Sequence, residues 1–94
     1  MLSLGSEAGA QVLLDAVRAD DPLVCVAVRV LANAGVVEAA PRIENAIYHC
    51  DLSRTDVVEC LVAGLRRFAD PLPDGVRVRI RAVEPAWLRD SLLK

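Results

Sequence analysis

The segment 22–34 is the most apolar stretch of the chain, and Arg29 and Asn33 are its only polar residues. Because they are four residues apart, an α-helix places them on one side and leaves the other directions apolar. Asp21 is a favourable N-cap residue, and Gly35 is a favourable residue after the last helical turn. The pattern predicts a central helix that neighbouring helices cover on most sides, with a single polar edge left free.

Helical periodicity also marks the segments on both sides of this central helix. Further helices are expected over 7–19, 37–50, 53–68 and 85–94. Pro41 suits the first turn of a helix, which also allows the second of these helices to begin near Ala40. The prolines and glycine within 70–75 predict a clear break.

The segment 76–83 fits two structures. Its strict alternation of apolar residues with three arginines is typical of a half-exposed strand. Val76, Ile80 and Val83 also follow the spacing of a helix face. A lone strand in a helical chain would leave its backbone groups unpaired. The sequence therefore favours a helix, and an extended segment that pairs with itself or with a partner stays open.

Composition bounds the class of protein. The chain has 94 residues, enough for a single domain over 1–94 or for one piece of a longer repeat array. It is 54% hydrophobic but only 3% aromatic, so its core consists of small and medium side chains. The net charge of −2 argues against bulk nucleic-acid binding, which usually requires an excess of lysine and arginine.

Cysteine usage and hydropathy indicate in which cellular compartment the protein is expected. The three cysteines, Cys25, Cys50 and Cys60, are an odd number and include no C-x-x-C pair. This pattern predicts reduced thiols that pack as small hydrophobic side chains in a cytoplasmic protein. No run approaches the length of a membrane span, and no basic segment precedes an apolar one at the N-terminus. We therefore expect neither a membrane span nor a signal peptide.

The chain is weakly similar to itself. A lag of 30 matches 13–21 with 43–51, and a lag of 34 matches 24–31 with 58–65. The additional residues fall at 51–56, in an expected loop. A two-helix unit that repeats every 30 to 34 residues is typical of an α-solenoid.

The first unit resembles the short bacterial HEAT-like repeats, including those of the phycobilin-lyase type. The similarity lies in a D-P-x-V turn, an A-x-x-x-L helix and a closing glycine, at Asp21, Pro22, Val24, Ala27, Leu31 and Gly35. The second unit departs from the pattern, because 51–56 lacks the D-P turn. The resemblance implies an all-α fold: a short solenoid of about two helical hairpins with a C-terminal helix, roughly five helices in all.

The resemblance also implies a binding face, because partners of HEAT-like repeats usually dock on the concave face formed by the second helices. In this chain that face would carry Arg29, Asn33, Asp56, Glu59, Ala63, and Arg66 or Arg67. The helix pattern alone puts the same residues on the polar sides of two largely buried helices. A solvated helix face without a partner is the simpler interpretation of these residues.

The C-terminal half offers two further candidates for an interface. Five arginines, Arg66, Arg67, Arg77, Arg79 and Arg81, lie within sixteen residues. They form either a solvated face or a docking patch for an acidic partner. Trp87 either plugs the end of the helix stack or anchors an interface. The apolar final helix folds back as a cap or meets another protein or a second copy.

Signatures of chemistry are absent from the sequence. It contains no phosphate-binding loop, no metalloprotease helix and no nucleophile elbow. His49 is its only histidine, and the spacing between His49, Cys50 and Cys60 fits no common zinc site. We therefore expect no enzyme, no cofactor and no metal.

These observations predict a non-catalytic protein–protein interaction module, either a small helical-repeat adaptor or a subunit of a larger assembly. The partner is expected to be another protein, with self-association through the C-terminal helix as a further possibility. Two alternatives stay open. One is an accessory lyase-like subunit that holds a cofactor-bearing partner, and the other is a nucleic-acid-associated regulator that uses the arginines of 66–81.

Overall fold

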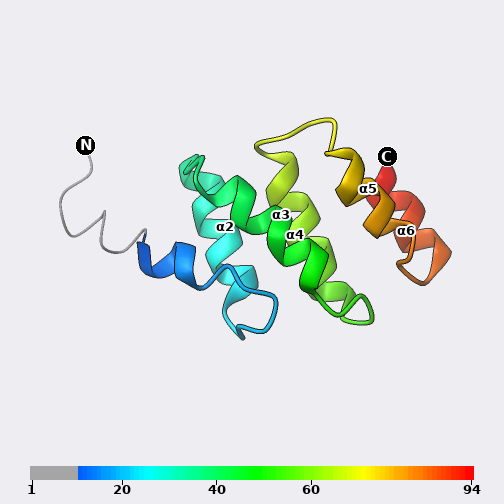
Figure 1. Ribbon diagram of the computed structural model, residues 1–94, viewed down its shortest axis with the longest axis horizontal. Helices are drawn as coiled ribbons and strands as arrows, with labels where there is room; N and C mark the ends of the chain where they lie inside the picture. The colour runs from blue at the N-terminus through cyan, green and yellow to red at the C-terminus, as the bar shows by residue number, and fades with distance from the viewer. Residues whose placement is uncertain (1–10) are drawn as a thin grey trace.

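The computed structural model describes residues 11–94, and within this range all regular structure is helical. Residues 11–15 form a short helical stretch that precedes the first labelled helix. The labelled helices are α2 (Val24–Ala34), α3 (Ala39–His49), α4 (Thr55–Arg66), α5 (Asp74–Ile80) and α6 (Ala86–Leu93) (Figure 1). The all-α prediction is confirmed for these residues. The segment left open at 76–83 is helical through Ile80, where α5 ends.

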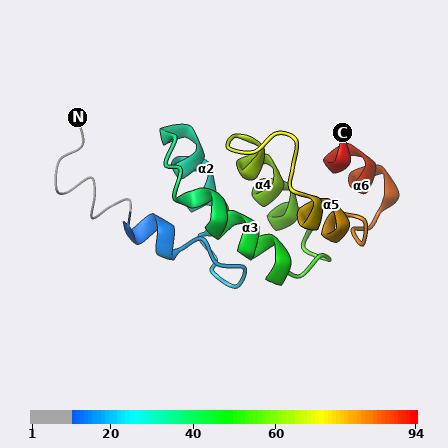
Figure 2. The same cartoon turned by 45° about the horizontal axis from the view of Figure 1, so that its top comes forward.

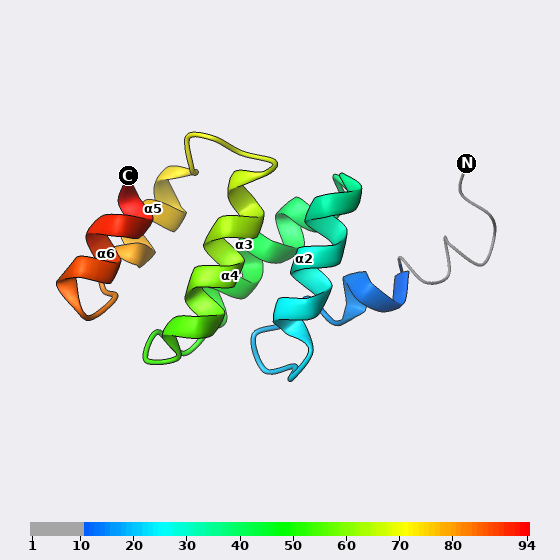
Figure 3. The same cartoon turned by 180° about the vertical axis from the view of Figure 1, so that it is seen from behind.

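The helices lie in two layers. In Figure 1, α3 and α5 lie in front of α2, α4 and α6, and in Figure 3, seen from behind, the order is reversed. Helix α2 lies beside α4, and α3 lies beside both α4 and α5. Figure 2 shows that α2 and α6 stand at opposite ends of the row. Each helix therefore packs mainly against its neighbours in the row.

The ends of α2 follow from local chemistry. The Asp21 carboxylate accepts a hydrogen bond from the Leu23 N–H at 2.8 Å. This bond closes a turn before the helix, and α2 begins at Val24. At the other end Gly35 adopts a left-handed φ of 71°, which favours glycine. The N–H groups of Gly35 and of the following residue return to carbonyls of the last turn, which is a Schellman ending.

Helix α2 is less covered than its sequence predicted. Its residues on the side of α3 and α4 are buried, but Leu23, Val26 and Val30 are 60%, 51% and 44% exposed. By helical spacing these three side chains lie on one side of α2, roughly opposite its buried residues. The prediction that neighbours cover this helix on most sides is therefore wrong for one side. Arg29 and Asn33 are exposed, as predicted.

The core is built of aliphatic side chains from both layers. The largest fully buried side chains are Leu31, Ile43, Ile47, Leu61, Leu65 and Ile80. They come from α2, α3, α4 and α5, so one continuous apolar seam joins the row. Burial of this kind stabilises a fold by about 25 cal/mol per Å² of apolar surface.

Arg79 joins α5 to the end of α3. Its Nε donates to the Ile47 carbonyl at 3.3 Å, and its Nη2 donates to the Cys50 carbonyl at 2.8 Å. The last carbonyls of a helix have no intrahelical partner, and a guanidinium near them also interacts favourably with the helix dipole. Arg79 is half-buried in this position. It therefore belongs to the fold and not to a free docking patch.

We expect Arg79→Ala to lower the free energy of unfolding by about 1–2 kcal/mol, because two charge-assisted hydrogen bonds are lost. Urea unfolding followed by circular dichroism measures this change. The matched control is Arg81→Ala, since Arg81 is exposed and its side chain makes no hydrogen bond with the described residues. Equal effects of the two substitutions would contradict the structural role of Arg79.

Candidate functional site

A pocket of about 280 Å³ opens between α2 and α4. Both helices supply its walls, with the lining residues Cys25, Val28, Arg29, Ala32, Asn33, Cys60, Ala63, Gly64 and Arg67. These two helices stand side by side in one layer (Figure 3). The pocket therefore lies at the junction of the two helices that the lag of 34 makes equivalent.

Small residues explain both the close approach of α2 and α4 and the pocket between them. A Cβ atom added to Gly64 would collide with Cγ1 of Val28. Only glycine at this position allows α4 to lie against α2 at this distance. Ala32 and Ala63 also line the pocket and project little into it. Close packing and an open pocket thus arise from the same small side chains.

The polar part of the pocket is positively charged. Arg29 and Asn33 come from α2, and Arg67 follows the last turn of α4. All three are exposed, and neither arginine forms an ion pair or a side-chain hydrogen bond with any residue of 11–94. Within residues 11–94, the arginines that do form ion pairs are Arg18, Arg42 and Arg89. No carboxylate of the described residues lines the pocket, so it suits an anion.

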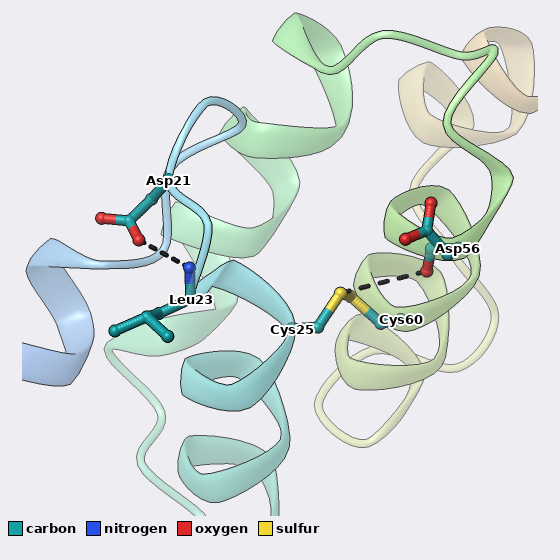
Figure 4. The surroundings of a disulfide bond; sticks show 5 residues. All are labelled: Asp21, Leu23, Cys25, Asp56 and Cys60. Carbon is teal, nitrogen blue, oxygen red and sulfur yellow. Dashed lines mark hydrogen bonds between the residues drawn. A yellow bond between two sulfur atoms is a disulfide. The ribbon is translucent and has the colours of Figure 1, made fainter.

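The apolar wall of the pocket contains a disulfide that sequence reasoning missed. Cys25 of α2 and Cys60 of α4 are bonded, with their Cα atoms 5.7 Å apart (Figure 4). The prediction of three reduced thiols is therefore wrong for these two. An odd cysteine count without a C-x-x-C pair does not exclude a bond between two helices 35 residues apart. The equivalence of the two helices, with one cysteine on each, was the only available signal.

The surroundings of the disulfide are open on one side. The Cys25 sulfur lies 4.0 Å from the Asp56 backbone carbonyl oxygen, the contact drawn in Figure 4. A disulfide sulfur has no hydrogen, so this contact becomes a hydrogen bond only when Cys25 is a thiol. The Asp56 carboxylate points away from the sulfurs in Figure 4. Both cysteines are half-buried and line the pocket.

Cys50 is different in kind. It is the free cysteine of the chain, 3% exposed, and its sulfur lies 3.3 Å from the Ile47 carbonyl oxygen. Burial raises the pKa of the Cys50 thiol, which outweighs the opposite effect of the nearby Arg79 charge. A buried, protonated thiol is a poor nucleophile. For this cysteine the prediction of a packed, reduced thiol is confirmed.

The remaining predicted interaction residues lie apart from the pocket. Asp56 and Glu59 are exposed on α4 but do not line it. Arg66 is half-buried and donates to the Leu92 carbonyl of α6, so it links two helices. Of the two arginines offered for the groove, only Arg67 reaches it. Trp87 is 69% exposed on α6, so it does not plug the described core.

The arginine-rich segment 66–81 does not form one free surface. Arg66 and Arg79 donate to backbone carbonyls, whereas Arg67 is exposed at the end of α4, and Arg77 and Arg81 are exposed on α5 and at its end. His49 is exposed at the end of α3, and no three His, Cys, Asp or Glu side chains gather into a metal-like cluster within 11–94. Within the same range, no helix has the length and apolar character that crossing a bilayer requires.

Comparison of the chain with protein-family models, with curated proteins and with solved structures gives no match. The functional argument therefore depends on the geometry of the pocket between α2 and α4.

Proposed function

We propose that the protein is a non-catalytic protein–protein interaction module, a short HEAT-like helical repeat whose pocket between α2 and α4 receives an acidic segment of a partner protein. The observation that carries this proposal is the pocket itself, which Arg29 and Arg67 both line without partners among residues 11–94. Two exposed guanidinium groups beside an apolar wall suit a peptide segment whose carboxylate meets the guanidinium groups and whose apolar atoms meet the wall.

The arrangement of the helices supports the repeat. Helices α2 and α4 are the second members of the two units related by the lag of 34, and they stand side by side in one layer. The HEAT-like resemblance assigns partner docking to the face made by such second helices. The pocket with its two arginines lies between these helices, which is where the resemblance expects a partner.

The chemistry of the lining supports binding without catalysis. Among its lining residues from 11–94, the pocket has no histidine, aspartate or glutamate that would serve as a general acid or base. Its volume of about 280 Å³ is at the lower limit for small-molecule sites, and it holds a side chain or a short segment. We place the protein in the cytoplasm, where disulfides are rare and, when present, usually form and open with the redox state.

We expect Arg29→Glu combined with Arg67→Glu to weaken the binding of an acidic peptide by at least about tenfold, because attraction becomes repulsion. A fluorescein-labelled oligoglutamate peptide, followed by fluorescence anisotropy, is the probe. Added salt should weaken the binding of the wild-type protein, since the interacting charges are exposed. Affinity capture from cell extract with the same variants then identifies the natural partner.

The matched control is Arg54→Glu, which reverses an exposed arginine at the start of α4, where a negative charge suits the helix dipole. This variant should bind the peptide as the wild type does. Absence of binding to oligoglutamate, or equal binding by the double variant, would refute the proposal. Tighter binding of single-stranded DNA, lost on substitution of Arg77 and Arg81, would support a nucleic-acid partner instead.

A further inference from the structure

The disulfide shares one pocket with two guanidinium groups that have no partner among residues 11–94. Cys25 and Cys60 form part of its wall, and Arg29 and Arg67 stand at its polar side. We propose that this pocket is a thiol-exchange site, at which a small anionic thiol opens the Cys25–Cys60 bond and remains attached to Cys60. The ligand class is a low-molecular-weight thiol that carries a carboxylate.

Charge selects the thiol. Arg29 follows Cys25 by one helical turn, and Arg67 follows Cys60 by about two, so both guanidinium groups lie on the side of α2 and α4 that carries the sulfurs. An attacking thiolate is negative, and a carboxylate on the same molecule adds a second anionic group. Positively charged clefts raise the local concentration of such ions and the rate at which they react. A neutral thiol attacks with a single negative charge and a cationic thiol with no net charge, so both are attracted less.

The position of each sulfur decides which one leaves. Cys25 lies in the first turn of α2, where the helix dipole stabilises a thiolate, whereas Cys60 lies in the middle of α4. In thiol–disulfide exchange, the sulfur of lower pKa departs faster. Attack therefore falls on Cys60, and Cys25 departs. The Asp56 carbonyl, 4.0 Å from the Cys25 sulfur, is the acceptor once that sulfur is protonated.

The exchange is balanced without any further reagent. The thiolate sulfur of the ligand forms a bond to Cys60 Sγ, the Cys25–Cys60 bond breaks, and its electron pair stays on Cys25 Sγ as a thiolate. The ligand sulfur is oxidised and Cys25 is reduced. In the reverse step the Cys25 thiolate attacks Cys60 Sγ and expels the ligand as a thiolate.

Exchange would also regulate the pocket. A bound anionic thiol fills part of its volume and neutralises the guanidinium groups, so it competes with an acidic partner. This consequence rests on the proposed function, whereas the exchange itself does not. A reversible modification of this kind would couple partner binding to the thiol pool.

The test uses the oxidised full-length chain with three probes, namely 3-mercaptopropionate (anionic), 2-mercaptoethanol (neutral) and cysteamine (cationic). The rate of disulfide opening is measured by quenching with iodoacetamide and mass spectrometry. Each rate is divided by the rate of the same thiol with hydroxyethyl disulfide, which removes differences in intrinsic nucleophilicity. We expect the corrected rate of the anionic thiol to exceed that of the neutral thiol by about tenfold.

Peptide mapping assigns the sulfurs. The expected product carries mercaptopropionate on Cys60 and the iodoacetamide label on Cys25, with Cys50 unmodified because it is buried. Arg29→Gln combined with Arg67→Gln should remove the preference for the anionic thiol, so its corrected rate should fall by a larger factor than that of the neutral thiol. Arg54→Gln, which lies outside the pocket, should retain the preference.

Several outcomes would overturn the inference: no disulfide in the oxidised chain, no preference for the anionic thiol, a preference that survives loss of both arginines, or the reverse labelling pattern. The assay contains no partner protein, so its result is separable from that of the proposed function. If anionic selectivity is observed but oligoglutamate does not bind, only the interaction-module proposal fails. If oligoglutamate binds through the arginines but selectivity is absent, only the exchange site fails.

Discussion

Reduction of the Cys25–Cys60 disulfide is expected to lower the free energy of unfolding by about 3 kcal/mol. The two cysteines are 35 residues apart, so the bond closes a loop that contains most of α2, all of α3 and the first half of α4. Such a closure removes conformations from the unfolded chain, and the core contacts of the folded state are unchanged by its loss. Urea unfolding with and without dithiothreitol measures the difference.

The matched control is the double variant Cys25→Ser and Cys60→Ser. It should unfold near the reduced wild-type protein, and dithiothreitol should not alter its midpoint. Cys50 remains in this variant as an internal reference for any effect of the reductant on a buried thiol. A wild-type midpoint that does not respond to the reductant would contradict a stabilising disulfide.

Substitution of Gly64 by leucine is expected to destabilise the fold by about 2–3 kcal/mol, despite a gain of about 1 kcal/mol in helix propensity. The first side-chain atom already collides with Val28 Cγ1. Valine has one strongly preferred rotamer in a helix, so Val28 cannot turn aside cheaply and the helices must separate. Urea unfolding measures the loss, and the same variant should bind acidic peptide poorly because Gly64 lines the pocket.

A double-mutant cycle isolates the contact. Gly64→Ala alone introduces the colliding methyl group, and Val28→Ala alone leaves a small cavity beside Gly64. In the double variant the new methyl group occupies the vacated space. Its loss of free energy of unfolding should therefore be about 1 kcal/mol smaller than the sum of the losses of the two single variants. Additive effects would show that the two helices do not meet at this point.

Local signals in the sequence were sufficient for most helices. The helix expected over 22–34 is present as α2 (Val24–Ala34), and the helix expected over 37–50 is α3 (Ala39–His49). Helix ends depend on nearby residues such as Gly35, whose left-handed conformation closes α2. Of the helix expected over 7–19, the part before residue 11 lies outside the described residues, and the described part is helical only to residue 15.

The choice between strand and helix for 76–83 depended on its tertiary contacts. Three alternating arginines suit a strand face and a helix equally, so periodicity alone gave no decision. In the fold, Val76 and Ile80 are fully buried on one face of α5, which lies beside α3. Arg79 binds the carbonyls at the end of α3. These are contacts over about thirty residues of chain, which no local pattern contains.

The candidate site was predictable in part. The polar edge of α2 with Arg29 and Asn33 followed from the apolar pattern around it, and both residues line the pocket. On α4, the choice between Arg66 and Arg67 depends on how the helix is rotated against its neighbours. The fold turns Arg66 towards α6 and Arg67 towards the pocket.

The sequence by itself determined most of the helices, with α5 as the exception, and which edge of α2 is polar, because capping residues and apolar spacing act within a few residues. Only the tertiary structure decided that Cys25 and Cys60 are bonded, that Val28 packs directly against Gly64, and that one apolar side of α2 is exposed. These features depend on the distance and rotation between packed helices. Several apolar arrangements satisfy the same spacing, and only the packing of complete helices selects one of them.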